Sequence, residues 1–219
     1  MVRYRTRFID MELNKQLDLG IRQVLILGAG FDSRSTRFAR HGVNFFEVDK
    51  MELLNFKQQC LETNHFKQTF IPVAANYLED GFFEKLRSAG FNLLEPTFII
   101  WEGNTMYLPR EAISLFLRTL ENSLPSFRIV FDYISSGVVT RTTGFPSITA
   151  IANAFAAMGS PWVCGFENIK GLTQAFKLAL TDAMPMADLR AKWEPTKPAA
   201  DIYRVYSICS LRRLNPATE

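Results

Sequence analysis

Residues 24–34 read Val-Leu-Ile-Leu-Gly-Ala-Gly-Phe-Asp-Ser-Arg, and residues 45–49 read Phe-Phe-Glu-Val-Asp. In the first stretch an apolar run ends in a glycine turn, and in the second an apolar run ends in an acid. Asp49 follows Gly30 by 19 residues, which is typical of the first two strands of a nucleotide-binding α/β unit. The stretch therefore predicts a site for an adenosine-containing cofactor, built from the backbone at Gly28 and Gly30 and from the carboxylate of Asp49.

The composition bounds the class of protein. With 219 residues, 47% of them hydrophobic and 21% charged, the chain can bury a substantial core and is predicted to form one domain over residues 1–219. A net charge of +3 without a dense basic block argues against a nucleic-acid-binding face. Three scattered cysteines predict neither a metal site nor a disulfide framework. Without a signal peptide or a membrane span, we expect a cytoplasmic protein.

Five apolar runs alternate with helical patterns along the first part of the chain. The runs are too continuous to leave one face of a sheet in water, so they suit a parallel sheet that is covered on both sides. We expect a doubly wound, Rossmann-like α/β sheet with right-handed crossovers. The predicted strands cover residues 22–27, 43–48, 68–74, 97–101 and 127–133, and the predicted helices cover 50–63, 80–89 and 109–121.

The regular alternation fades after residue 135. Residues 145–158 and 169–178 are predicted to be helices. Residues 203–211 (Tyr-Arg-Val-Tyr-Ser-Ile-Cys-Ser-Leu) predict a closing strand, antiparallel to the others and at the edge of the sheet. The sheet is thus predicted to be mostly parallel with an antiparallel edge strand.

The glycine turn also bears on the identity of the cofactor. A plain tight turn is the competing interpretation of Gly28 and Gly30, but Asp32 and Ser33 are good helix N-caps and an acid ends the next strand. Ser33 occupies the position of the third glycine of the dinucleotide fingerprint, which argues against NAD. S-adenosylmethionine contains the same adenosine without phosphate and is favoured. An NAD-linked oxidoreductase remains an alternative.

Four stretches in order resemble the leucine carboxyl methyltransferase family. They are residues 5–10 (RTRFID), 25–38 (LILGAGFDSRSTRF), 45–49 (FFEVD) and 101–108 (WEGNTMYL). This family is a branch of the S-adenosylmethionine-dependent methyltransferases, and it includes protein phosphatase carboxyl methyltransferases and bacterial small-molecule O-methyltransferases. The resemblance covers about residues 3–135 and implies a methyltransferase fold that binds S-adenosylmethionine.

The resemblance also implies roles for individual residues. Arg5 corresponds to the arginine that pairs with the methionyl carboxylate of the cofactor, and Gly28 and Gly30 correspond to the turn beneath that group. Asp49 corresponds to the acid that binds the ribose hydroxyls. A carboxylate suits this role because it can accept two hydrogen bonds from a cis-diol.

Further positions follow the third and fourth predicted strands. Asn76 and Tyr77 stand where the family has Asp-Leu beside the adenine, and a neutral amide accepts weaker hydrogen bonds than a carboxylate. Glu102 corresponds to an acid close to the cofactor. The family carries a longer N-terminal segment that covers the cofactor, whereas this chain starts almost at Arg5. The resemblance therefore implies a shortened N-terminal lid.

The methyl acceptor decides whether a general base is needed. A carboxylate acceptor needs none, whereas a hydroxyl acceptor needs a base within hydrogen-bond reach. His41 and His65 precede predicted strands and should lie at the amino edge of the sheet, away from the ligand. Asp132 and Tyr133, after the fifth predicted strand, are candidate bases, but we assign no catalytic residue.

We expect a small-molecule acceptor, and a protein C-terminal carboxylate stays open as a substrate. A methyltransferase-like binding domain without turnover is the other hypothesis, because Asn76 departs from the family pattern and the lid is short.

Overall fold

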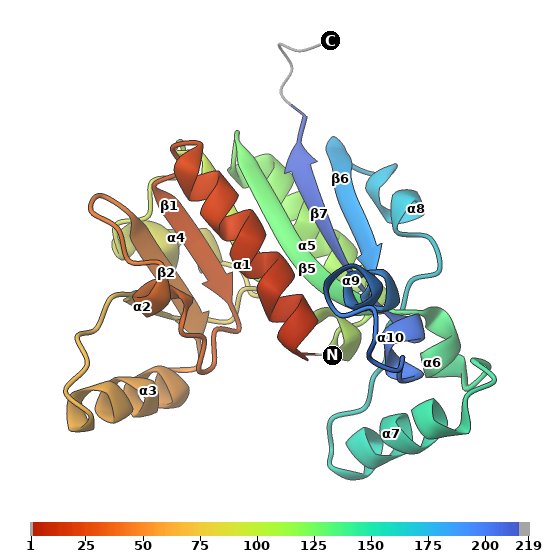
Figure 1. Ribbon diagram of the computed structural model, residues 1–219. Coiled ribbons are helices and arrows are strands. Elements are labelled where there is room, and N and C mark those ends of the chain that lie inside the picture. Colours follow the sequence, from red (N-terminus) through yellow and green to blue (C-terminus); the bar gives the residue numbers. More distant parts are fainter. Residues whose placement is uncertain (1, 215–219) are drawn as a thin grey trace.

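The computed structural model describes residues 2–214 and contains a seven-stranded sheet in the order β3-β2-β1-β4-β5-β7-β6. The strands are β1 (Gln23–Leu27), β2 (Asn44–Asp49), β3 (Ile71–Ala74), β4 (Thr97–Trp101), β5 (Phe127–Ile134), β6 (Leu178–Pro185) and β7 (Tyr206–Arg213). β7 runs antiparallel to both of its neighbours, β5 and β6, whereas the pairs among β1 to β5 are parallel. The predicted doubly wound and mostly parallel α/β sheet is confirmed (Figure 1).

Helices cover both faces of the sheet because its strands are apolar on both sides. One face packs against α4 (Phe82–Ser88), α5 (Arg110–Ser123) and α8 (Ile169–Thr173). The other packs against α1 (Val2–Asp18), α3 (Met51–Thr63), α9 (Met186–Trp193) and α10 (Ile202–Val205), and α7 (Pro146–Ala157) adds Ile148 and Ala152 to the same apolar cluster. The short helices α2 (Arg34–Arg37), η1 (Thr105–Tyr107) and α6 (Ser136–Thr140) lie in the connections.

The C-terminal part differs in detail from the prediction. The predicted antiparallel strand is β7, but it lies second from the edge because β6 pairs along its outer side. Residues 169–178 are only helical as far as Thr173, and β6 begins at Leu178. Asp132 and Tyr133 lie within β5, not after it: the predicted range 127–133 already contains both residues, and the strand extends to Ile134.

Helix α1 is one of the elements that the sequence analysis did not predict. Its buried residues, which include Phe8, Ile9, Leu13 and Leu17, recur at helical spacing and pack on the sheet. The helix crosses the sheet with its N-terminal end at the carboxyl ends of the parallel strands (Figure 1). It therefore brings its first residues to the edge where ligands bind in such sheets.

The parallel register places the strand ends level with one another. Leu27 of β1 pairs with Val48 of β2, and Asp49 pairs with Ala74 of β3. The chain order changes direction between β1 and β4, which is the switch point at which open α/β sheets bind ligands. Among residues 2–214, no helix is both long enough and apolar enough to cross a bilayer.

Candidate functional site

The turn after β1 is held by the carboxylate at the end of β2. Gly28 and Gly30 have φ angles of 59° and 50°, a backbone region that favours glycine. The N–H of Gly30 donates to Asp49 Oδ2 at 2.8 Å, and the N–H of Lys50 donates to Asp49 Oδ1 at 2.7 Å. The glycine turn and Asp49, which the sequence predicts to meet at the site, are therefore in direct contact.

A cavity of about 530 Å³ lies beside this contact. Gly28, Asp49, Asn76 and Tyr77 all contribute to its walls, and so do residues of β2, β3 and the segment after β4. Its size lies within the range of pockets that hold small ligands. The complete lining is Gly28, Val48, Asp49, Lys50, Met51, Glu52, Ala74, Ala75, Asn76, Tyr77, Leu78, Asn104 and Leu108.

Asn76 and Tyr77 differ in how firmly they are held. The exposed Asn76 accepts from the N–H of Leu78 at 3.1 Å and donates to Glu79 Oε1 at 3.0 Å. The Tyr77 hydroxyl donates to Asn104 Oδ1 and accepts from Trp101 Nε1, both at 3.1 Å, and burial raises its pKa. Asn76 thus offers an exposed polar edge to the cavity, whereas Tyr77 forms a wall that two side-chain hydrogen bonds hold in place.

Asn104 lies directly over Gly28 and was not singled out by the sequence analysis. A Cβ at Gly28 would come within 2.6 Å of Asn104 Oδ1. Asn104 Nδ2 also donates to the carbonyls of Leu27 at 3.3 Å and Glu102 at 2.7 Å. Asn104 therefore ties the turn after β1 to the segment after β4, and it requires glycine at position 28.

Arg5 and Glu102 meet each other, but neither lines the cavity. Arg5 Nε donates to Glu102 Oε1 at 2.6 Å, and Arg5 Nη1 donates to Asp132 Oδ2 at 2.8 Å and to the Tyr206 hydroxyl at 2.7 Å. Burial lowers the pKa of Arg5, but attraction to Asp132, Tyr206 and Glu102 outweighs burial and raises it. The guanidinium is therefore a permanent cation, and its three hydrogen-bond partners come from β5, β7 and the segment after β4.

Arg34 is a second buried cation in this network. Its Nε donates to Asp10 Oδ1 at 2.7 Å, and its Nη1 donates to Glu102 Oε2 at 2.6 Å and to the carboxylate of Asp32. Asp32 Oδ1 also accepts from the N–H of Arg34 at 2.7 Å, whereas Ser33, at the N-cap of α2, makes no side-chain cap bond. Arg34 thereby connects α1, the glycine turn and the end of β4.

A buried ion pair lies beneath the glycine turn. Lys57 of α3 donates to the carboxylate of Glu47 in β2 and to the carbonyl of Asp32. Glu47 is fully buried, and that burial raises its pKa to about 7 against the opposing effect of Lys57. The turn therefore rests on a charged pair that the sequence analysis did not identify.

The candidate bases are unsuited to proton abstraction. Asp132 is fully buried, and both of its oxygens accept hydrogen bonds, including one from the N–H of Gly103 at 2.6 Å. Burial raises the pKa of Tyr133 to about 12. His41 and His65 are exposed and lie in the connections before β2 and β3, as predicted. In the part of the chain that the structure describes, no cluster of metal-ligating side chains is found.

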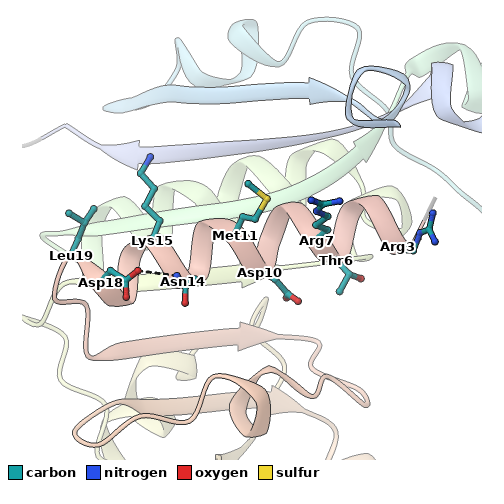
Figure 2. A pocket seen from close by; sticks show the side chains of 9 residues that line it. All are labelled: Arg3, Thr6, Arg7, Asp10, Met11, Asn14, Lys15, Asp18 and Leu19. Carbon is teal, nitrogen blue, oxygen red and sulfur yellow. Dashed lines mark hydrogen bonds between the residues drawn. The ribbon is translucent and has the colours of Figure 1, made fainter. Parts of the chain in front are cut away.

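A larger cavity lies elsewhere, along the outer face of α1, with a volume of about 910 Å³ (Figure 2). It is an open groove along a single helix, and it includes a hydrogen bond from Asn14 to Asp18 at 2.9 Å. We identify the smaller cavity as the candidate site, because backbone and side chains from several strand ends converge there. The groove is lined by Arg3, Thr6, Arg7, Asp10, Met11, Asn14, Lys15, Asp18 and Leu19.

Comparison with known sequences gives a consistent set of relatives. The sequence pattern described as leucine carboxyl methyltransferase matches residues 1–121, which is more than half of the chain. A predicted S-adenosyl-L-methionine-dependent methyltransferase of Streptomyces coelicolor is 38% identical over 143 residues, covering 63% of this chain and 50% of that protein. One from Frankia alni is 36% identical over 165 residues, covering 73% of this chain and 54% of that protein. The chain thus spans about half the length of these relatives.

Solved structures share the fold at low sequence identity. A DUF574 family protein from Streptomyces avermitilis superposes with a TM-score of 0.70 and 16% identity, covering 97% of this chain and 83% of that one. The magnesium protoporphyrin IX methyltransferase of Synechocystis, solved with bound SAH (S-adenosylhomocysteine), has a TM-score of 0.61 and 11% identity, covering 97% and 84%. The sheet order and the antiparallel β7 are those of the methyltransferase fold.

Proposed function

The chain belongs to the leucine carboxyl methyltransferase family, and we propose that residues 1–219 act as one S-adenosylmethionine-dependent O-methyltransferase domain. The observation that carries the proposal is the position of Asp49, whose carboxylate contacts the N–H of Gly30 at 2.8 Å and lines the same cavity as Gly28. When bound, S-adenosylmethionine supplies an electrophilic methyl group on a sulfonium sulfur.

The residues around the cavity fit the adenosine part of that cofactor. Each oxygen of Asp49 accepts one backbone N–H, and because a carboxylate has about four acceptor sites, capacity remains for a ribose diol. No atom lies within 4 Å of a Cβ placed on Gly30, so the turn leaves room above it. We propose that Asn76 and Tyr77 border the adenine, since both line this cavity.

The same features favour S-adenosylmethionine over NAD. A pyrophosphate would need the N-terminus of a helix, and α2 is only four residues long, so its dipole is small. Arg5 offers a cation for the methionyl carboxylate, while Glu102 orients it by pairing with both Arg5 and Arg34.

A carboxylate is the acceptor that this chemistry favours. A hydroxyl acceptor would have to lose a proton, and neither the buried Asp132 nor Tyr133, with its raised pKa, is suited to take it. A carboxylate arrives already ionised, so the protein has only to align it and exclude water. We propose a small-molecule carboxylate, and the carboxylate at a protein C-terminus is the other case to test.

Two measurements test this function. Calorimetry should detect binding of S-adenosylhomocysteine and no binding of NADH. An isotopically labelled methyl donor, offered with panels of carboxylic acids, phenols and peptides, should yield a base-labile methyl ester of a small carboxylic acid. Asp182→Asn in β6, away from the cavity, is the control that should leave both results unchanged.

Other outcomes each reject a stated part of the proposal. A methyl ether from a phenol would contradict the carboxylate assignment, and a methylated peptide would contradict the small-molecule assignment. Binding without transfer to any acceptor would indicate a binding domain without turnover. Binding of NADH alone would contradict the cofactor.

A further inference from the structure

Asp132 is a carboxylate buried in the middle of the sheet, and both of its oxygens accept hydrogen bonds. Its Oδ2 accepts from Arg5 Nη1 at 2.8 Å and from the Tyr206 hydroxyl, and its Oδ1 accepts from the N–H of Gly103 at 2.6 Å. Its side chain has no exposed surface. A buried charge is costly unless it is paired, so this residue depends on partners from α1, β7 and the segment after β4.

These contacts order Arg5 in a defined orientation. Glu102 holds Nε, while Asp132 and Tyr206 hold Nη1, so the plane of the guanidinium is fixed from two sides. Within residues 2–214, Nη2 of Arg5 has no hydrogen-bond partner, and the side chain keeps 15% of its surface exposed. One edge of a preordered cation thus remains available for an anion, without the loss of side-chain entropy that ordering a free arginine requires.

Asp132 also fixes the segment after β4, which lies beside Gly28. Its bond to the N–H of Gly103 holds a residue with a φ of 72°, and the next side chain, Asn104, lies over Gly28. The Thr105 hydroxyl donates to the carbonyl of Asp132. One residue of β5 therefore holds both the Arg5 cation and the segment that carries Asn104.

We propose that Asp132, together with Tyr206, is a positioning residue that orients Arg5 toward the carboxylate of the amino-acid part of the cofactor. The inference rests on the proposed function, because it takes the ligand to be S-adenosylmethionine. It adds that recognition of the amino-acid part depends on a buried residue that never touches the ligand. It also gives a role to a carboxylate in β5 that is too buried to act as a base.

The same hydrogen bonds would be present if Asp132 only stabilised the fold. The test must therefore separate a positioning role from a structural one. S-adenosylhomocysteine and 5′-methylthioadenosine share the adenosine and the thioether sulfur, but only the first carries an amino-acid carboxylate. Loss of a positioning residue should weaken only the first ligand, whereas general damage to the fold should weaken both.

The experiment measures the dissociation constants of both ligands by calorimetry for the wild type, Asp132→Asn, Tyr206→Phe and the control Asp182→Asn. In Asp132→Asn the affinity for S-adenosylhomocysteine should fall at least about tenfold, as expected for a weakened charged contact, while that for methylthioadenosine changes less than about threefold. Tyr206→Phe, which removes one hydroxyl, should show the same selectivity with a smaller loss. Asp182→Asn should change neither.

Equal losses for the two ligands, or no loss for either, would overturn the inference. If Asp132→Asn does not fold, the ratio of the two affinities in Tyr206→Phe decides in the same way. A wild-type protein that binds neither ligand would contradict the proposed function itself, and this outcome is distinct from binding without selectivity in the variants.

Discussion

The two halves of the candidate site are built in different ways. Around Gly28 and Asp49 the site is made largely of backbone, from residues that follow one another along the first three strands. Around Arg5 it is made of charged side chains, and the contact from Arg5 to Tyr206 spans 201 positions of the sequence. The half around Gly28 and Asp49 therefore depends on local backbone conformation. The half around Arg5 depends on how α1 and β7 pack in the folded protein.

The largest expected effect tests the backbone-built half. Gly28→Ala should lower the free energy of unfolding by about 3–4 kcal/mol, because the positive φ costs about 1–2 kcal/mol and a displaced Asn104 loses its hydrogen bonds. Gly30→Ala is the matched control with a similar φ but open space, so strain alone of about 1–2 kcal/mol applies. Urea unfolding measures both, and equal losses would show that Asn104 does not constrain position 28.

The next effect concerns the charged pair beneath the glycine turn. Burial raises the pKa of Glu47 to about 7 from 4.5, so the folded protein binds this proton more tightly than the unfolded chain. The contribution of the protonated Glu47 to the free energy of unfolding is therefore fully present below pH 4.5 and is lost as the pH rises toward 7. From pH 5 to pH 8 the free energy of unfolding should fall by on the order of 2–3 kcal/mol more in the wild type than in Glu47→Gln.

Urea unfolding at several pH values checks this difference. The charged groups facing Glu47 are Lys57 and Asp32, and they are unchanged in the variant. Parallel pH profiles for the two proteins would contradict the assignment and would indicate that Glu47 titrates as it does in water.

The smallest expected effect is on ligand affinity, and it distinguishes the two halves of the site. Asp49→Asn keeps an acceptor and loses the charge, so the affinities for S-adenosylhomocysteine and for methylthioadenosine should both fall by about tenfold. Both ligands carry the ribose, and this result would contrast with the selective loss expected for Asp132→Asn. Calorimetry measures both affinities. If Asp49→Asn weakens the binding of S-adenosylhomocysteine alone, the division of the site into two halves is contradicted.

Much of the sheet could be predicted because its first five strands are short, continuous apolar runs. The strand β6 was missed because Leu178–Pro185 alternates in burial, contains Thr181 and Asp182, and ends in proline. Helix α1 does carry a signal in its sequence, because Ile9, Leu13 and Leu17 recur at helical spacing.

The same distinction holds for the site. The contact of Asp49 with Gly30 follows from the lengths of two strands and one turn, so spacing predicted that the two would meet. The pairing of Arg5 with Asp132 depends on which face of β5 lies under α1, and no local sequence pattern indicates that face. The position of Asp132 in the sequence therefore predicts a candidate base, whereas its buried side chain pairs with Arg5.

A crystal structure of the complex with S-adenosylhomocysteine tests the central claim most directly. The account predicts both ribose hydroxyls within hydrogen-bond distance of the Asp49 carboxylate, about 2.5–3.2 Å, with the ligand passing over Gly28 and Gly30. A ligand bound elsewhere, for example in the groove along α1, or an Asp49 carboxylate that contacts only its own backbone partners, would contradict it.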